Sequence, residues 1–135
     1  MILDKNLILS DAQAKTSTGT HLSDNIIDTV KVGDAVNELY FVAYVETACT
    51  SGGSATVEIK LVTDSDVNIG SPTVLWSSGA IPKASLVDKY CFGIVRLPKA
   101  NKLERYIAAQ IVIGTAALTA GAFDIYLTDN PQTNI

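Results

Sequence analysis

The sequence predicts an all-β fold, either an antiparallel β-sandwich or a jelly roll, preceded by an extended N-terminal arm. Two hairpins of matching pattern, residues 43–66 and 109–131, each run an apolar strand into a turn of small residues and return on a strand of period two. Glycine, proline and serine separate seven or eight short apolar runs along the chain. Regular spacing of this kind is typical of two packed sheets.

The first element is a segment of 20 residues that we expect to form an arm, with a single β-sandwich domain over residues 21–135. Residues 15–20 (KTSTGT) are polar and rich in turn formers. The apolar side chains before them are too few for a sheet core but too many for a free tail: Ile2, Leu3, Leu7, Ile8 and Leu9. We therefore expect the arm to be ordered by packing on a neighbouring subunit or another partner.

The next elements are a short strand at residues 25–30 and a long one at residues 39–49. Residues 34–39 between them are the only stretch that favours a turn of helix. The long strand is apolar at both odd and even positions, which is typical of a strand covered on both faces.

Two later strands alternate between apolar and polar residues. Residues 56–63 place one set of side chains inward and the other outward, and residues 123–127 repeat the pattern. Shorter strands are expected at residues 72–76, 90–97 and 106–113. The expected inward residues are Val57, Ile59, Leu61, Phe123, Ile125 and Leu127, and the expected outward ones are Glu58, Lys60, Asp124 and Tyr126.

The composition favours a protein that binds other proteins. The 135 residues fit one domain, and only 18% of them are charged while 47% are hydrophobic. A formal net charge of −4 disfavours nucleic acid as a partner. No stretch has the pattern of a signal peptide or a membrane span, so we expect synthesis in a cytoplasm and no membrane partner. Cys49 and Cys91 lack any metal-binding spacing and are expected to be reduced.

Residue types that carry catalysis are scarce. His21 is the only histidine, and nothing in the sequence fixes it beside a nucleophile and a carboxylate. Residues 64–70 (DSDVNIG) resemble half of an EF-hand loop, but Ile69 and Leu75 occupy the positions of the required glycine and glutamate. Glu46 and Glu58 lie on the two strands of the first hairpin, where they can approach each other. Charged residues on a solvent-facing strand are explained by solubility alone. Because none of these groups forms a convincing catalytic or metal-binding arrangement, we expect no enzymatic activity, cofactor or metal.

Two groups of residues favour binding. Arg96, Lys99, Lys102 and Arg105 gather four of the ten basic residues in one loop with only Glu104 as counter-charge. Such a loop either seats an acidic surface of a partner or is simply solvated. The aromatic residues Tyr40, Tyr44, Trp76 and Tyr126 are candidates for an interface or for stacking on sugars.

Four stretches, distributed over nearly the whole length of the chain, resemble sequences of one known protein family. They are MILDKNLILSDAQA at the start, SGAIP at residues 78–82, LPKANKLERYI at residues 97–107 and TAGAFDIYLTDNPQ at residues 119–132. With them the chain resembles a family of tailed-phage capsid cement (decoration) proteins. The resemblance implies an antiparallel jelly-roll-like β-sandwich on the outer surface of an icosahedral head, made in the host cytoplasm, which clamps neighbouring subunits of the major capsid protein. It also implies a homodimer or another homo-oligomer, and no catalytic residues.

The sequence therefore predicts a structural protein of the virion capsid, with a carbohydrate-binding β-sandwich module as the alternative. The alternative requires an aromatic platform on one exposed face, for which Tyr40 and Tyr44 are the candidates. The expected capsid or subunit interface consists of apolar arm residues, the two tyrosines and the basic loop: Ile2, Leu3, Leu7, Leu9, Tyr40, Tyr44, Arg96, Lys99, Lys102 and Arg105.

Overall fold

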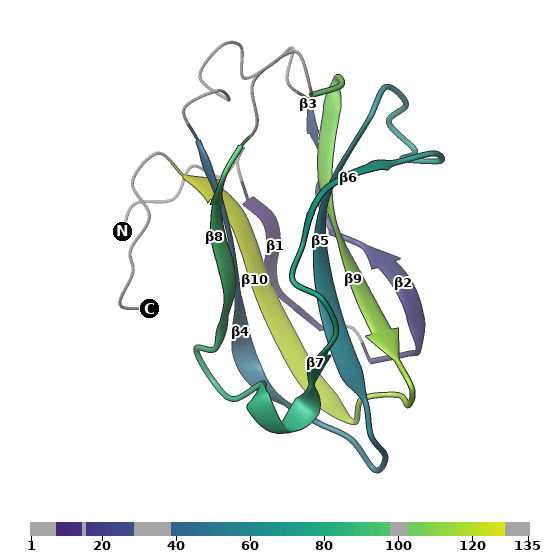
Figure 1. The fold of residues 1–135 in the computed structure, drawn as a ribbon, viewed down its shortest axis with the longest axis vertical. Coiled ribbons are helices and arrows are strands. Elements are labelled where there is room, and N and C mark those ends of the chain that lie inside the picture. Colours follow the sequence, from purple (N-terminus) through teal and green to yellow (C-terminus); the bar gives the residue numbers. More distant parts are fainter. Residues whose placement is uncertain (1–7, 15, 29–38, 98–102, 129–135) are drawn as a thin grey trace.

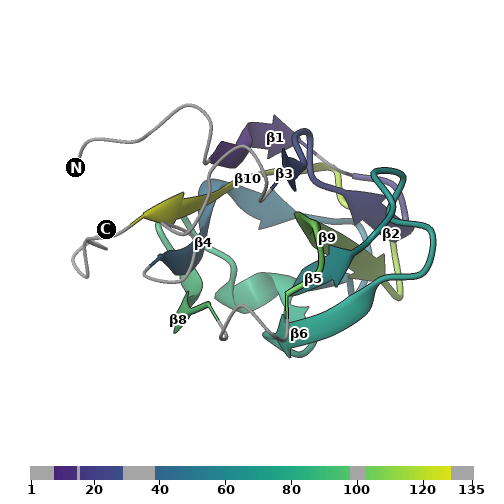
Figure 2. The ribbon, with the colours of Figure 1, turned by 90° about the horizontal axis from the view of Figure 1, so that it is seen from above.

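The computed structural model describes residues 8–14, 16–28, 39–97 and 103–128 and shows two antiparallel sheets packed face to face (Figures 1 and 2). Its elements are β1 (Ile8–Ala14), β2 (Gly19–Leu22), β3 (Ile27–Asp28), β4 (Tyr40–Thr50), β5 (Thr56–Asp64), β6 (Thr73–Ser77), β7 (Ile81–Pro82), the 3₁₀-helix η3 (Lys83–Ser85), β8 (Cys91–Arg96), β9 (Tyr106–Gly114) and β10 (Ala120–Thr128). Sheet A has four strands in the order β1-β10-β4-β8. Sheet B has six, with the order β2-β9-β5-β6 and with β3 and β7 paired to β9 and β5. Within the described residues no helix is long and apolar enough to cross a bilayer.

The order of the strands is that of a jelly roll. Leaving aside the two-residue strands β3 and β7, the first strand pairs with the last (β1 with β10), the second with the next to last (β2 with β9), and so on inward to β4 with β8 and β5 with β6. This nested pairing is one long antiparallel hairpin wrapped around a core, which closes eight strands into two sheets. The predicted all-β, jelly-roll-like sandwich is therefore confirmed.

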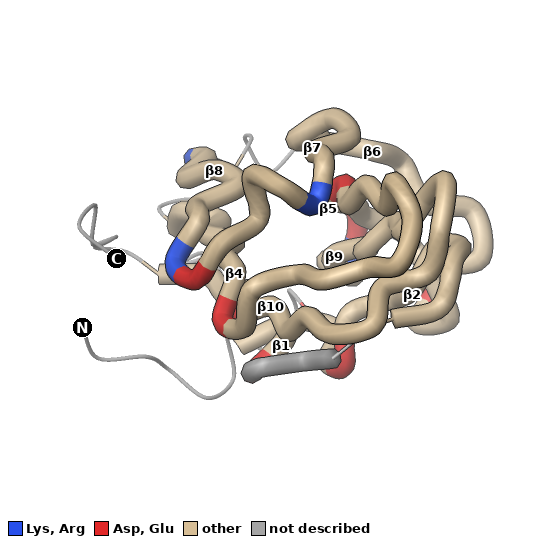
Figure 3. The backbone as a smooth tube through the Cα atoms, turned by 90° about the horizontal axis from the view of Figure 1, so that it is seen from below, with Lys and Arg blue, Asp and Glu red and all other residues tan. Residues whose placement is uncertain are grey.

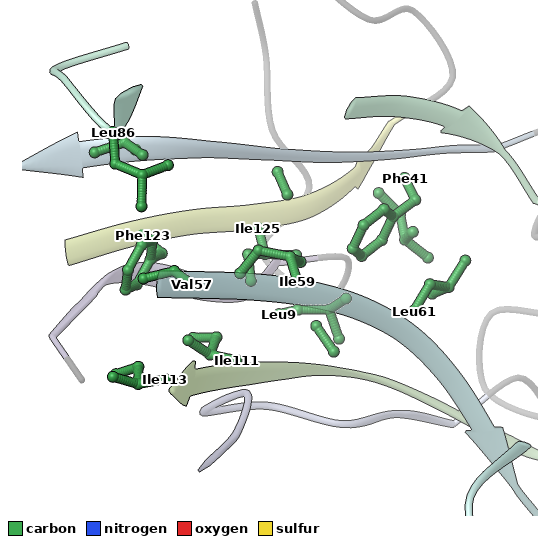
Figure 4. Close-up of a cluster of buried hydrophobic side chains, with 14 of the residues drawn as sticks. Leu9, Phe41, Val57, Ile59, Leu61, Leu86, Ile111, Ile113, Phe123 and Ile125 are labelled. Atoms are coloured by element: carbon green, nitrogen blue, oxygen red, sulfur yellow. The ribbon is translucent and has the colours of Figure 1, made fainter. Parts of the chain in front are cut away.

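The core lies between the sheets and is built from the alternating residues that the sequence singles out. Val57, Ile59 and Leu61 on β5 have no exposed surface, and Phe123 and Ile125 on β10 are equally buried. Figure 4 shows these side chains converging from facing strands, with Leu86 after η3 closing one end. Leu127 is 1% exposed, so all six predicted inward residues are confirmed. Their outward neighbours Glu58, Lys60 and Asp124 are half-buried.

The structure differs from the expected arm over residues 1–20. Residues 8–14 form β1, which pairs with β10, and Leu9 is completely buried in the core. The backbone N–H of Asn25 also donates to the Leu9 carbonyl at 2.9 Å, which ties β1 to the segment after β2. Residues 19–22 form β2 on sheet B. These residues are strands of the sandwich itself, and residues 1–7 lie outside the described part of the chain.

A glycine lets the two sheets close at the β6 and β8 edge. Trp76 on β6 packs against Phe41 with ring centroids 5.8 Å apart, so it is a partly buried wall of the core and not an exposed aromatic residue. A Cβ at Gly93 on β8 would lie 2.6 Å from Cζ2 of Trp76. Only a residue without a side chain leaves room for the indole there.

The loop between β5 and β6 uses its carboxylates to hold its own backbone. Asp64 accepts hydrogen bonds from the N–H groups of Ser71 at 2.9 Å and Asp66 at 3.1 Å, and these donors hold its pKa below the ordinary value. Asp66 in turn accepts from the N–H of Asn68 at 3.0 Å. Ile69, at the position where an EF-hand has glycine, is buried with φ of 50°. The half-motif of the sequence is therefore a hydrogen-bonded turn of the type that aspartate and asparagine form.

Candidate interaction surface

The candidate site lies on the outer face of sheet A, the face turned away from the core. On β4 the even residues point outward, because the odd residues Phe41, Ala43 and Val45 enter the core. On β10 the outward residues are Asp124 and Tyr126, and the strand pairing sets them opposite Tyr44 and Val42. Phenol rings and carboxylates thus gather at the centre of this face.

A pocket of about 200 Å³ opens between β1, β10 and β4. Figure 3 shows acidic positions along the tube beside these three strands. The walls of the pocket combine two phenol rings, two carboxylates, a hydroxyl and one aliphatic side chain, from Tyr44, Tyr126, Asp11, Asp124, Ser10 and Ile8. The pocket therefore has an aromatic wall and an acidic rim.

An irregularity in β1 brings Asp11 to the pocket. Ile8 lies opposite Tyr126 and Ser10 opposite Ile125, so β1 holds an extra residue at this point, and the register shifts again between Ser10 and Gln13. Strict alternation would turn Asp11 toward the core together with Leu9. The bulged backbone instead places Ser10 and Asp11, two consecutive residues, along the same pocket.

The carboxylates and phenols of this face influence one another. The hydroxyl of Tyr44 is partly buried and hydrogen-bonds to Asp124, and both effects raise its pKa. The pKa of Glu46 is raised above its ordinary value of 4.5, chiefly by a hydrogen bond with Asp124 and by the charge of that carboxylate. Burial is the main cause that raises the pKa of Tyr126, and the negative charges of the Cys91 thiolate and the Asp124 carboxylate add to it. The face thus carries more negative charge than its own groups neutralise.

One lysine offsets part of this charge. The ammonium of Lys89 lies 3.5 Å from a Glu46 carboxylate oxygen and 5.5 Å from the centre of the Tyr44 ring. Both side chains of the pair are more than one third exposed, so the pair contributes little to stability. Lys89 does not belong to the pocket wall.

Replacing Glu46 with glutamine is expected to raise the thermal stability of the protein at pH 7. A raised pKa means that the folded protein holds this proton more tightly than the unfolded chain, so the contribution of this carboxyl group to stability is fully present below its ordinary pKa of 4.5 and is lost as the pH rises through the raised pKa. Glutamine keeps a hydrogen-bond donor for Asp124 without the charge. The melting temperature of Glu46→Gln should exceed that of the wild type at pH 7 and match it near pH 4.

Glu58→Gln on sheet B is the control for this comparison, because Glu58 accepts a hydrogen bond from Ser77 and has no carboxylate partner in the described hydrogen bonds. The melting temperature of Glu58→Gln should not exceed that of the wild type at pH 7. If the melting temperature of Glu46→Gln differed from that of the wild type by the same amount at every pH, this explanation would be contradicted.

The structure places the predicted interface residues in different settings. Tyr40 and Tyr44 are half-buried on the outer face of sheet A, and Arg96 is exposed at the end of β8. Leu9 is in the core and is not available to a partner, since its contacts are with its own domain. Ile2, Leu3, Leu7, Lys99 and Lys102 lie outside the described residues.

Arg105 is not an uncompensated charge of the basic loop. Its guanidinium donates two hydrogen bonds to Asp28, at 3.1 and 3.0 Å, and lies 5.1 Å from the centre of the Tyr106 ring. This bidentate pair raises the pKa of Arg105 and links the start of β9 to β3. The sequence named Glu104 as the counter-charge because Asp28 is distant along the chain.

Two further expectations need correction. Tyr126 is only 2% exposed: Tyr44 packs edge-on against it, with ring centroids 6.1 Å apart, and Ile8 of β1 lies opposite it. Glu46 and Glu58 do not meet, since β4 and β5 belong to different sheets and both residues point away from the core. The sequence reading also missed Ser10, Asp11 and Asp124 as members of one pocket.

The remaining candidates lie outside the pocket. His21 lies on β2, where its Nε2 donates to the Ser17 carbonyl oxygen at 2.6 Å. Cys49 is a buried free thiol whose pKa burial raises to about 11, and Cys91 is an exposed free thiol at the start of β8. In the described parts of the chain, no three histidine, cysteine, aspartate or glutamate side chains are grouped to hold a metal ion.

Comparison with known protein families identifies the relatives of this fold. The family model Bbp16 matches residues 9–127, which run from β1 to β10 and include all of the sandwich except one residue at each end. The chain belongs to the Bbp16 family. Bbp16 is a phage protein, so the chain is phage-encoded. The Bbp16 match begins within β1, in agreement with the place of that strand in the domain. No curated protein matches the chain.

Proposed function

We propose that the protein is a capsid cement protein, which binds the outer surface of an icosahedral phage head and clamps neighbouring subunits of the major capsid protein. The proposal rests on the resemblance to tailed-phage cement proteins, and it is supported by membership of the Bbp16 phage family and by the jelly-roll fold, an architecture that recurs in viral capsid proteins. The low share of charged residues, 18%, supports extensive contact with other proteins. On this proposal the protein acts by binding alone and not as an enzyme.

Binding can strengthen a shell without any chemistry. A protein that binds the expanded shell more tightly than its precursor stabilises the expanded state in proportion to that difference in affinity. A rigid sandwich suits this role because it loses little conformational entropy on docking. We propose that the protein acts as a homodimer, because two copies of one docking face can hold two capsid subunits together. The outer face of sheet A, with Tyr40 and Tyr44, and the exposed Arg96 are the candidate contacts.

The test is co-sedimentation of the purified protein with expanded heads of its phage assembled without it. We expect saturable binding, and we expect the loaded heads to withstand higher temperature before they release DNA or break. Precursor heads serve as the matched control and should bind more weakly. Failure to bind expanded heads at micromolar concentration would contradict a cement function.

The alternative function is a carbohydrate-binding module, because jelly rolls also occur in lectins. Binding of the purified protein to a glycan array tests it. Tyr44, one of the two candidate platform residues, meets the ring of the buried Tyr126 at 81°, so these two rings form no shared flat platform for a sugar. We therefore expect no glycan to bind. Saturable glycan binding without binding to heads would favour the carbohydrate-binding module.

A further inference from the structure

The pocket on sheet A has the composition of a site for an organic cation. Asp11 and Asp124 contribute carboxylates from two strands, and Tyr44 and Tyr126 contribute aromatic rings. Among the described residues of its wall, none is basic. Carboxylates supply the opposite charge for a guanidinium or ammonium group, and phenol rings attract it through their negative faces.

A polar group in the pocket wall supports this assignment independently of the charges. The side chain of Tyr126 is almost fully buried, and within the described structure its hydroxyl has no hydrogen-bond partner. Buried hydroxyls are rarely left unpaired, because removing them from water without a partner is costly. A bound donor in the pocket would give this hydroxyl a partner.

The backbone and the local charge point the same way. The bulge in β1 turns Asp11 out of the core direction and onto the pocket rim, and bulges often re-aim side chains next to functional sites. The negative charge of Asp124 already raises the pKa of Glu46, so this face carries excess negative charge that a bound cation would offset. Lys89 satisfies Glu46 and Tyr44 from outside the pocket.

We propose that this pocket receives one basic side chain, an arginine or a lysine, of a protein partner. A volume of about 200 Å³ that opens to the surface suits the end of one long side chain. The identity of the partner rests on the proposed function, which makes it a major capsid subunit. The chemistry of the pocket does not depend on that function and is tested first.

The first experiment titrates the ¹⁵N-labelled protein with N-acetyl-arginine amide and N-acetyl-lysine amide, followed by NMR. At least one probe should shift the amide signals around Ser10, Tyr44 and Asp124 saturably, with a Kd on the order of 1 mM, as expected for so small a ligand. N-acetyl-citrulline amide, which has the shape of the arginine probe but no charge, should bind at least about tenfold more weakly. Absence of saturation, or equal binding of the neutral probe, would overturn the proposal.

Variants locate the binding. Asp124→Asn and Asp11→Asn should each weaken the cationic probe about tenfold, because each removes one charged acceptor. Asp11 is exposed, so its variant reports on the pocket even if Asp124→Asn disturbs Tyr44 and Glu46. Glu58→Gln removes one carboxylate from the opposite sheet and should leave binding unchanged. An equal loss in Glu58→Gln would show that general charge, not the pocket, attracts the probe.

The second experiment repeats the head co-sedimentation with the double variant Asp11→Asn/Asp124→Asn. If a capsid side chain enters the pocket, head affinity should fall at least about tenfold while Glu58→Gln binds normally. Normal head binding by the double variant would overturn the capsid subunit as the source of the side chain, although the cement function would stand. If no form binds heads, the cement function fails and the probe titration still decides the chemistry of the pocket.

Discussion

A chain that begins at residue 15 will not fold. Removing β1 takes the fully buried Leu9 out of the core and leaves one edge of β10 without its partner strand. A buried leucine contributes about 2–5 kcal/mol, and each lost backbone hydrogen bond costs about 0.5–1.5 kcal/mol more. Together these losses approach the total stability of a small domain, about 5–15 kcal/mol. Circular dichroism and size-exclusion chromatography of the truncated protein measure the outcome.

A chain that begins at residue 8 is the control, because it keeps every described strand. It should fold. The single substitution Leu9→Ala should lower the free energy of unfolding by about 2–5 kcal/mol. A folded chain beginning at residue 15 would mean that β1 is the dispensable arm that the sequence suggested.

The substitutions Ile59→Ala and Ile125→Ala should each reduce the free energy of unfolding by about 2–5 kcal/mol. Both side chains are completely buried, one in each sheet, so the lost methyl groups leave a cavity that the facing sheet cannot fill without moving. Urea denaturation followed by tryptophan fluorescence gives the values, since Trp76 is the only tryptophan and lies against the core.

Val74→Ala is the matched control for the two isoleucines. Val74 is 49% exposed on β6, so its truncation should change stability by less than about 0.5 kcal/mol. Equal effects at all three positions would mean that the pairing register of β5 or β10 differs from the one described.

The parts of the fold that the sequence predicts are those with a local pattern. Residues 56–61 alternate between polar and apolar side chains, and residues 123–127 do so apart from Tyr126, so which of these side chains enter the core follows from the chain itself. Strand β1 could not be predicted in this way, because its extra residues break the alternation and because its partner strand lies at the other end of the chain. Pattern alone cannot tell a strand with a distant partner from an arm.

The pocket depends even more on tertiary structure. Tyr44, Asp124 and Tyr126 come from two strands that only the pairing of β4 with β10 brings together, and Asp11 arrives from a third. Alternation already sets Asp124 and Tyr126 on one face, which is the signal that was available. The burial of Tyr126 could not be predicted from the sequence, because it depends on tertiary contacts such as the edge-on contact with Tyr44.

The nested pairing of the strands also determines when this protein can fold during its synthesis. The ribosome makes β1 first, yet its partner β10 is the last described strand to emerge, and residue 8 faces residue 126. β2 likewise waits for β9 and β4 for β8, so early in translation only the β5 and β6 hairpin has both of its strands. Folds dominated by such distant pairs form slowly and expose unpaired strand edges in the meantime. The yield of folded protein should therefore rise when expression is slowed or chaperones are abundant, because the nascent chain must avoid neighbouring copies until its final strand is released.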